Sequence, residues 1–321
     1  MEIVTIDLGG THARFAIAEV AHGRVAKLHH TVTIKTGHHA SLTAAWQEFA
    51  ATMGKPLPSA ASLAVACPVN GHLIKLTNNA WIIEPEKLKQ DLRLHTLTVV
   101  NDFGAVGHAV AQMANEDFAH ICGPQIPLPQ EGVISIIGPG TGLGVAQVLR
   151  RGPCVHVIET EGGHSDFAPL DTVEDAILAY LRERFCRVSV ERIASGPGLL
   201  YIYEALAALE NAPAVFHDVK ELWQAALNNH DLLARNALER FCLTLGAVAG
   251  DIALTQGAAA VVIAGGVGLR LADYLPRSGF AARFVAKGRF QSLMQAMPVK
   301  LITDPQVGLI GAAAAFAQWH T

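Results

Sequence analysis

Charged and aromatic residues are both scarce in this sequence, and long hydrophobic runs are missing. Only 16% of its 321 residues are charged, 6% are aromatic, and the formal net charge is −4. Because there is no basic excess, nucleic acid is not an expected partner. The apolar runs are broken by glycine and fall short of the roughly 20 residues that span a bilayer, so no membrane partner is expected either.

Cysteine is also rare, and its spacing argues against two kinds of stabilised fold. The five cysteines are odd in number and form no CxxC pair, so neither a disulfide framework nor a zinc site is indicated. No signal-peptide pattern opens the chain, and a cytoplasmic location is expected. The cysteines are predicted to be small buried residues: Cys67, Cys122, Cys154, Cys186 and Cys242.

Small and apolar residues are abundant, and the chain is long enough for two domains. Continuous apolar strands alternate with helices, which predicts a parallel sheet covered on both faces. The opening strands are linked too tightly for crossover helices, so they are expected to pair antiparallel and to make the sheet mixed. These strands are Ile3–Asp7, Ala13–Glu19 and Lys27–Thr33; helices are expected over Ser41–Met53, Thr172–Phe185 and from Asp231 to Gly257.

Two glycine-rich loops each connect one strand to another strand. In dinucleotide and P-loop sites the glycine-rich loop connects a strand to a helix instead. IDLGGTHARFA runs strand, glycine loop, strand, and VISIIGPGTGLGVAQV repeats that order after the proline-rich connector Pro124–Gly132. The GxGxxG pattern of dinucleotide sites fails at Leu143, and no GxxxxGK[ST] sequence occurs. The repeat therefore predicts two similar domains, each opening with a hairpin that has a glycine-rich tip.

A glycine-rich hairpin tip presents backbone N–H groups in a concave row, which suits a phosphate. Thr11 and Thr141 add hydroxyl donors to the two tips. Asp7, at the end of the first strand, is placed to hold Mg²⁺ through water beside the phosphates. The alternative is a pair of ordinary tight hairpins.

The segment VVNDFGAVGHA brings Asn101 and Asp102 to the end of an apolar strand, just before a helix. Ligands gather at the carboxyl ends of parallel strands, so Asp102 is a candidate general base. The competing interpretation is that Asp102 only caps the helix. Asn101 offers both a donor and an acceptor, as a polyhydroxylated ligand requires.

Three further segments carry weaker signals. In ETEGGHSDFAP, the glycine pair argues against a helix, and a loop that joins Glu161 to His164 suits sugar hydroxyls better than zinc. Glu191 precedes a turn of small residues, where a surface glutamate is the default. Gly265 and Gly266 end an apolar strand, and they fit the close approach of a flat ring or a helix start equally well.

Taken in order, these motifs resemble those of the bacterial glucokinase family, in the group without the zinc motif of repressor-type sugar kinases. DLGGTHARFA and GPGTGLG are similar to its phosphate motifs, and NDFGAVGHA to its catalytic segment. EGGHSDFAP, ERIASGPG and IAGGV are similar to its sugar and adenosine segments, and TNNAW to a stretch near the sugar. Ile6 departs from the pattern, because close relatives often have glycine there.

The resemblance implies two actin/hexokinase-like α/β domains, each with a mixed sheet flanked by helices, and a cleft between them. The expected bounds are 1–112 with about 303–321 for the smaller domain and 113–302 for the larger. It implies ATP- and Mg²⁺-dependent phosphorylation of glucose at the 6-hydroxyl, in a homodimer. The resemblance implies Asp102 as the base. It implies that the sugar is bound by Asn78, Asn101, Asp102, Glu161, His164 and Glu191. The nucleotide is assigned to Ile6, Asp7, Leu8, Gly9, Gly10, Thr11, Gly140, Thr141, Gly142, Gly265 and Gly266, with Asp7 also holding Mg²⁺ through water.

Two alternatives stay open on the sequence. A related kinase could act on fructose, mannose, an amino sugar or a carboxylate, although the site loops hold no convergent Arg or Lys for a carboxylate. A sugar-responsive regulator would need a DNA-binding domain, for which the few residues before Ile6 leave no expected room, and the net charge has the wrong sign.

Overall fold

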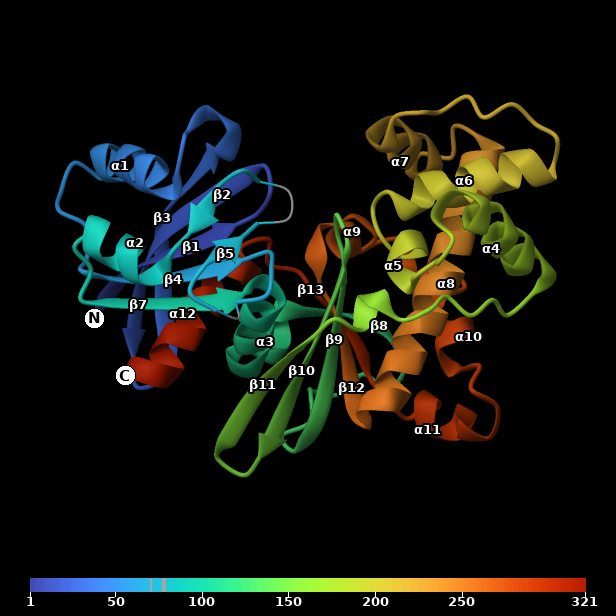
Figure 1. The fold of residues 1–321 in the computed structure, drawn as a ribbon. Helices are drawn as coiled ribbons and strands as arrows, with labels where there is room; N and C mark the ends of the chain where they lie inside the picture. Colours follow the sequence, from blue (N-terminus) through green and yellow to red (C-terminus); the bar gives the residue numbers. More distant parts are fainter. Residues whose placement is uncertain (70, 77–78) are drawn as a thin grey trace. The chain divides into compact units, whose positions relative to one another are not determined.

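The computed structural model describes residues 1–69, 71–76 and 79–321, which divide into two compact units (Figure 1). Unit 1 comprises Met1–Ala114, Val157–Glu159 and Asp304–Thr321. Unit 2 comprises Asn115–His156 and Thr160–Thr303. Val157–Glu159 is grouped with unit 1 although it lies within the range expected for the larger domain.

Unit 1 is built on a five-stranded sheet with the order β3-β2-β1-β4-β7. The first three strands pair antiparallel, while β1, β4 and β7 run parallel, so the predicted mixed sheet is confirmed. The strands are β1 Glu2–Leu8, β2 His12–Ala21, β3 Arg24–Lys35, β4 Ala60–Val65 and β7 Thr96–Asn101, beside a small pair of β5 Ile74–Lys75 and β6 Ile82–Ile83.

Helices cover both faces of this sheet because successive strand residues point to opposite sides. Val4, Ile6 and Leu8 of β1 pack on one face with α1, whose N-cap Ser41 accepts a hydrogen bond from Ala44 N at 3.2 Å. Ile3 packs on the other face with α12. The helices of unit 1 are α1 Leu42–Met53, α2 Pro85–Asp91, α3 Asp102–Gln112 and α12 Val307–His320.

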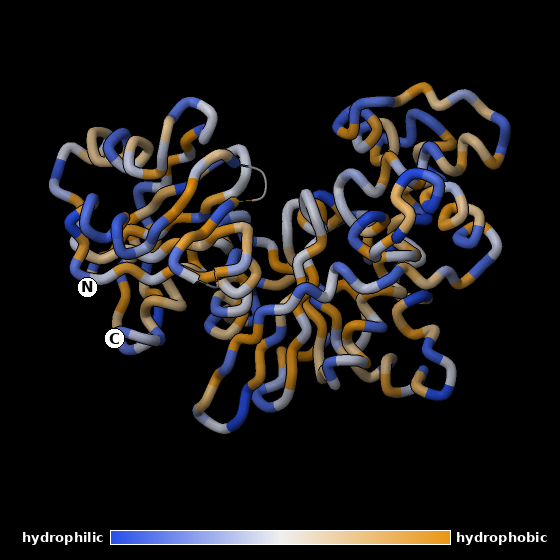
Figure 2. The backbone as a smooth tube through the Cα atoms, in the orientation of Figure 1, coloured by the Kyte–Doolittle hydropathy of each residue, from blue (hydrophilic) through white to orange (hydrophobic). Residues whose placement is uncertain are grey.

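Unit 2 has a six-stranded sheet with the order β11-β10-β9-β12-β13-β8. Its opening hairpin β9–β10 is antiparallel, like β1–β2, and β12 pairs parallel with β9. Figure 2 shows hydrophobic residues concentrated along the strands. The strands are β8 Phe118–Cys122, β9 Gly132–Pro139, β10 Leu143–Arg151, β11 Cys154–Thr160, β12 Ala258–Ile263 and β13 Val299–Ile302.

The long helix α8 is the centre of the helical part of unit 2. Asp231 caps its start by accepting from Ala234 N at 2.7 Å, and Gly257 ends it in the left-handed conformation, both as predicted. Phe241 is fully buried and meets Trp223 edge-on. The helices are α4 Thr172–Phe185, α5 Val190–Ile193, α6 Gly198–Leu209, α7 Val219–Leu227, α8 Leu232–Gln256, α9 Gly265–Arg270, α10 Phe280–Val285 and α11 Gln291–Gln295.

No helix within the described ranges is long and apolar enough to cross a bilayer. The prediction that the cysteines are buried is wrong for Cys154 and Cys186, which are exposed, whereas Cys67 and Cys242 are buried. Cys154 opens the edge strand β11, and Cys186 is the C-cap of α4.

A buried ion-pair network ties the start of α4 to α8 and α10. Glu174 is 1% exposed and accepts a hydrogen bond from Leu170 N at 2.8 Å. Its Oε1 lies 3.1 Å from Arg283 Nη2 and 3.5 Å from Arg240 Nη1, and both guanidinium groups also contact Asp171. The network positions the chain that follows the Glu161–His164 loop.

We expect Glu174→Ala to lower the free energy of unfolding by about 3 kcal/mol, because it removes a buried anion from two partly buried cations. Chemical denaturation measures this, and the exposed Glu183→Ala on the same helix should stay within about 0.5 kcal/mol of wild type. A loss below about 1 kcal/mol for Glu174→Ala would show that Asp171 alone neutralises both arginines.

Candidate functional site

The glycine tip of unit 1 is a closed turn between β1 and β2. Gly9 N donates to His12 O at 3.0 Å, and Thr36 Oγ1 and Asn79 Nδ2 both donate to Gly10 O, at 3.0 and 3.3 Å. The Thr11 hydroxyl lies 2.9 Å from His12 Nδ1. The carbonyl group of Gly10 is thus fixed by two side chains, which keeps the turn in one conformation.

Asp7 lies on the face of β1 that packs against α12. Its carboxylate is 3.3 Å from Arg14 Nη1, and a Cβ on Gly308 would come within 2.8 Å of it. Burial raises the pKa of the Asp7 carboxyl, and the charge of Arg14 opposes that rise. Only a glycine at position 308 leaves room for the carboxylate beside the helix start.

Ile6 and Leu8 point away from Asp7, into the core on the α1 side. Ile6 is 1% exposed and Leu8 is fully buried, so of these two residues only the backbone could reach a ligand. Asn78, expected near the sugar, lies outside the described residues.

Asn101, and not Asp102, is the N-cap of α3. Its Oδ1 accepts from Phe103 N at 2.8 Å and Gly104 N at 3.2 Å, while its Nδ2 donates to Cys67 O at 3.2 Å. The alternative that Asp102 serves only as the cap is therefore wrong. Asp102 is the first helical residue, half-buried, with its Oδ1 2.9 Å from Phe103 N.

Strand register brings the tip and Asp102 to the same edge of the unit 1 sheet. Leu8 is opposite Val65 on β4, and Val65 is opposite Asn101 on β7. Neighbouring strands lie about 4.8 Å apart, which places the ends of β1 and β7 roughly 10 Å from each other. A phosphate bound at the tip and a hydroxyl group bound at Asp102 would therefore both lie at this edge of the sheet.

In unit 2, the tip between β9 and β10 is surrounded by three of the other motifs. Gly140 N donates to Gly142 O at 2.8 Å, and Gly196 N donates to Gly140 O at 2.7 Å. The Glu191 carboxylate accepts from Leu143 N at 3.0 Å, and a Cβ on Gly142 would lie 2.4 Å from it. Glu191, whose default interpretation was a surface residue, instead supports the β9–β10 tip from the short helix α5.

The loop with Glu161 and His164 packs against β10 beside that tip. The two side chains lie 4.0 Å apart, and both are exposed to solvent. Gly162–His164 forms only a single 3-10 turn, so Glu161 and His164 meet in a loop and not on an α-helix. A Cβ on Gly163 would lie 2.0 Å from Leu143 O, which explains why the turn can sit so close to the strand.

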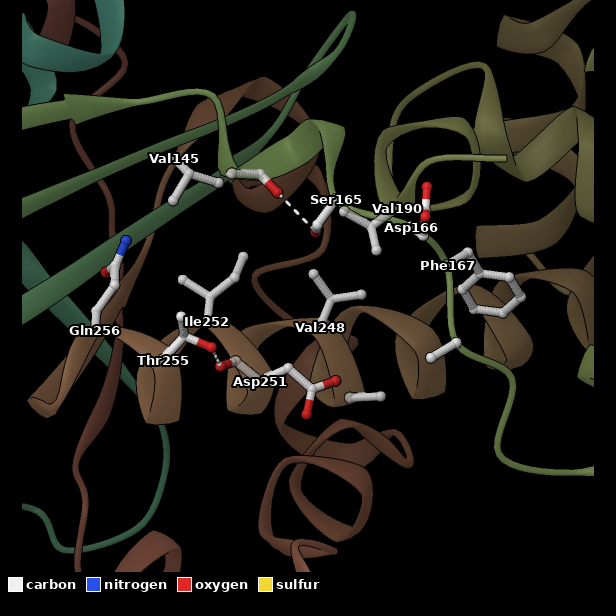
Figure 3. A pocket seen from close by; sticks show the side chains of 13 residues that line it. Val145, Ser165, Asp166, Phe167, Val190, Val248, Asp251, Ile252, Thr255 and Gln256 are labelled. Carbon is white, nitrogen blue, oxygen red and sulfur yellow. Dashed lines mark hydrogen bonds between the residues drawn. The ribbon is translucent and has the colours of Figure 1, made fainter. Parts of the chain in front are cut away.

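A cavity of about 310 Å³ lies behind this loop, against α8 (Figure 3). Its walls are mainly apolar and include Val145, Phe167, Val248 and Ile252. The Asp251 carboxylate at its edge is paired with Lys287 Nζ at 2.6 Å. An apolar lining does not suit a polyhydroxylated ligand, so the cavity backs the loop and is not the candidate sugar site.

Gly265 and Gly266 form the first turn of α9, so the interpretation of this glycine pair as a helix start is correct. Gly265 has φ 79°, and a Cβ there would lie 2.7 Å from Pro139 O. A Cβ on Gly266 would meet no atom within 4 Å. Gly265 therefore serves close packing on β9, and Gly266 is the one of the two that leaves open space.

Glu2, Glu19 and His29 offer three potential metal-ligand atoms within 4.8 Å at the other end of β1 from Asp7. The His29 ring lies 3.6 Å from Glu2 and 3.9 Å from Glu19, distances at which a protonated imidazole would pair with both carboxylates. This group lies outside the edge that carries the tip and Asp102.

Sequence reasoning missed three residues that the structure places at the candidate site. Gly308 faces Asp7, Glu159 contacts Asn101, and Arg187 donates to His164 O at 2.5 Å. Gly308 and Glu159 are far along the chain from their partners, and Arg187 is 23 residues from His164. No local pattern marks such pairs.

The fold and the motif geometry define the class of protein as a sugar kinase of the hexokinase type. A solved glucokinase from an Antarctic psychrotroph superposes with a TM-score of 0.86 at 32% identity, covering 98% of each chain. A ROK family glucokinase from Streptomyces griseus, solved with glucose and AMPPNP, shares the fold with a TM-score of 0.64 at 20% identity, covering 98% of this chain and 99% of that one.

The family follows from two further comparisons. Residues 4–319 match the family model described as Glucokinase. A curated glucokinase from Zymomonas mobilis subsp. mobilis is 61% identical over 321 residues, which is 100% of this chain and 99% of the relative. The chain belongs to the glucokinase family, as the resemblance of its motifs predicted, and its reaction class is phosphoryl transfer from ATP to glucose.

Proposed function

We propose that Asp102 is the general base that takes the proton from the 6-hydroxyl of glucose as the γ-phosphoryl group of ATP arrives. The observation that carries this role is that Asn101, and not Asp102, is the N-cap of α3. Asn101 caps the helix, so the half-buried carboxylate of Asp102 is not required for capping and stands at the edge of the sheet that also carries the glycine tip. Phosphoryl transfer needs mainly positioning and charge stabilisation, which a fixed strand–helix junction supplies.

The remaining sugar hydroxyls are proposed to bind Asn101, Glu161, His164 and Glu191, with Asn78 as a further contact from the sequence. Asn101 has one amide hydrogen engaged by Cys67 O, which leaves its second amide hydrogen for a ligand. Glu161 and His164 are exposed on one turn, where an acceptor and a donor 4.0 Å apart can bind adjacent hydroxyls.

The two glycine tips are proposed to bind the phosphates of ATP, through Gly9, Gly10 and Thr11 in unit 1 and Gly140, Thr141 and Gly142 in unit 2. Gly266 supports an adenosine role because a ring could approach its open backbone, whereas Gly265 is closed by Pro139.

The donor chemistry at Asp7 fits Mg²⁺. A carboxylate offers hard oxygen ligands, and the gap left by Gly308 gives those oxygens space beside the helix start. Asp7 would hold the ion, directly or through water, and the ion would supply charge compensation for the phosphates. A homodimer in the cytoplasm completes the proposal.

The test is ADP release by the purified protein with ATP and Mg²⁺, in parallel reactions with glucose, fructose, mannose, N-acetylglucosamine and no sugar. Strong turnover with glucose is expected, on the order of 1–100 s⁻¹. Turnover with a different sugar would overturn the assignments of Glu161, His164 and Glu191 while keeping those of the phosphate tips. Absence of turnover from folded protein that binds ATP would overturn the proposed reaction.

A further inference from the structure

Within unit 1, the Val157–Glu159 stretch contacts the helix that carries Asp102, and Glu159 supplies a hydrogen bond at the start of that helix. Glu159 Oε1 accepts a hydrogen bond from Asn101 N at 3.2 Å. Val157–Glu159 is part of unit 1, the same compact unit as α3. The Asn101 backbone is therefore held at its N–H by Glu159, while the Asn101 side chain is held by Cys67 O and by the first N–H groups of α3.

Two glycines on α3 make this approach possible. A Cβ on Gly104 would lie 2.0 Å from Glu159 Oε1, and a Cβ on Gly107 would lie 2.5 Å from Val157 Cγ1. Glycine inside a helix costs about 1 kcal/mol relative to alanine, so two of them within one short helix call for a packing reason. The close passage of Val157 and Glu159 over α3 is that reason.

We propose that Glu159 is a positioning residue for the phosphoryl-transfer reaction, and this rests on the proposed role of Asp102. The bond from Asn101 N fixes the residue immediately before Asp102 from a second side, which sets the direction in which the Asp102 side chain leaves the helix. A carboxylate at the start of α3 is also favourable for the helix dipole. Loss of the bond lets the junction relax and misplaces the base.

The first test compares Glu159→Ala with Glu159→Gln. The alanine variant is expected to lose about tenfold in kcat with an unchanged KM for ATP, because a small misplacement of a reacting group is costly. The glutamine variant keeps an oxygen that can accept from Asn101 N, so its kcat should lie within about threefold of wild type. Glu131→Ala, an exposed acid elsewhere on the chain, is the control and should change neither constant.

The second test uses Gly104→Ala, whose new methyl group would push the Glu159 carboxylate away from Asn101. Its nearest contacts are all atoms of the Glu159 side chain, so the same substitution made in Glu159→Ala should lower kcat no further. A merely structural role for Glu159 would instead lower the thermal stability of both single variants and leave the kcat of the folded protein at its wild-type value.

Wild-type kcat in Glu159→Ala, equal losses in the alanine and glutamine variants, or wild-type kcat in Gly104→Ala would each overturn the proposal. Asp102→Asn separates this failure from that of the proposed function. If Asp102→Asn is severely impaired while Glu159→Ala is normal, only the role of Glu159 is wrong. If Asp102→Asn itself has wild-type kcat, both the assignment of Asp102 as the base and the positioning role of Glu159 are wrong.

Discussion

Asp102→Asn is expected to lower kcat by roughly 10²–10⁴-fold and to leave the KM for glucose and for ATP within about threefold of wild type. The asparagine amide keeps the shape of the side chain and can still accept the hydrogen bond from Phe103 N, which is 2.9 Å from Asp102 Oδ1. It cannot take a proton from the sugar. The expected loss is thus confined to the transition state, where the hydroxyl proton is transferred.

Steady-state kinetics at saturating glucose and ATP, with thermal unfolding of the same preparations, measure this effect. The fold should be unaffected, because Asn101 supplies the cap of α3. Asp91→Asn, an exposed acid at the end of α2, is the matched control and should retain full kcat. Near-normal turnover in Asp102→Asn would show that the hydroxyl loses its proton to another group.

The parts of the fold that sequence predicts are those with local signals. The β1–β2 and β9–β10 hairpins combine period-two alternation with a glycine break, and both form as predicted. Ser41, Asp231 and Gly257 mark helix ends through capping chemistry that involves only neighbouring residues. Short helices escape this reasoning: α5 spans only 4 residues and α9 only 6, less than two full helical turns.

In the candidate site too, the sequence predicts residues that have local signals and misses contacts between distant parts of the chain. Asn101 and Asp102 are found from sequence because a strand end in a parallel sheet is a known place for ligands. The sequence does not decide which of the two caps the helix, because Asn and Asp are both favoured at the N-cap and the two residues are adjacent. The contacts of Glu191 with Leu143, of Gly308 with Asp7 and of Glu159 with Asn101 join distant parts of the chain. They arise from tertiary packing, which local propensity does not encode.

The absence of a side chain at position 163 sets the position of the Glu161–His164 loop. A Cβ on Gly163 would lie 2.0 Å from the carbonyl oxygen of Leu143, a backbone atom within the β9–β10 hairpin that cannot move cheaply. In Gly163→Ala the loop must therefore shift outward, and Glu161 and His164 shift with it. A displacement of about 1 Å at a binding group can cost 10²-fold, so we expect kcat/KM for glucose to fall by about that factor.

Gly162→Ala is the matched control, one residue earlier in the same turn. Its Cβ would meet Val145 Cγ1 at 3.1 Å, and Val145 borders the 310 Å³ cavity, into which its side chain can give way. Its loss in kcat/KM should stay within about threefold, and the KM for ATP should be normal in both variants because neither methyl group meets the Gly140–Gly142 tip. Equal losses in the two alanine variants would show that the loop tolerates no added methyl group anywhere, and that the Leu143 carbonyl oxygen is not the contact that positions Glu161 and His164.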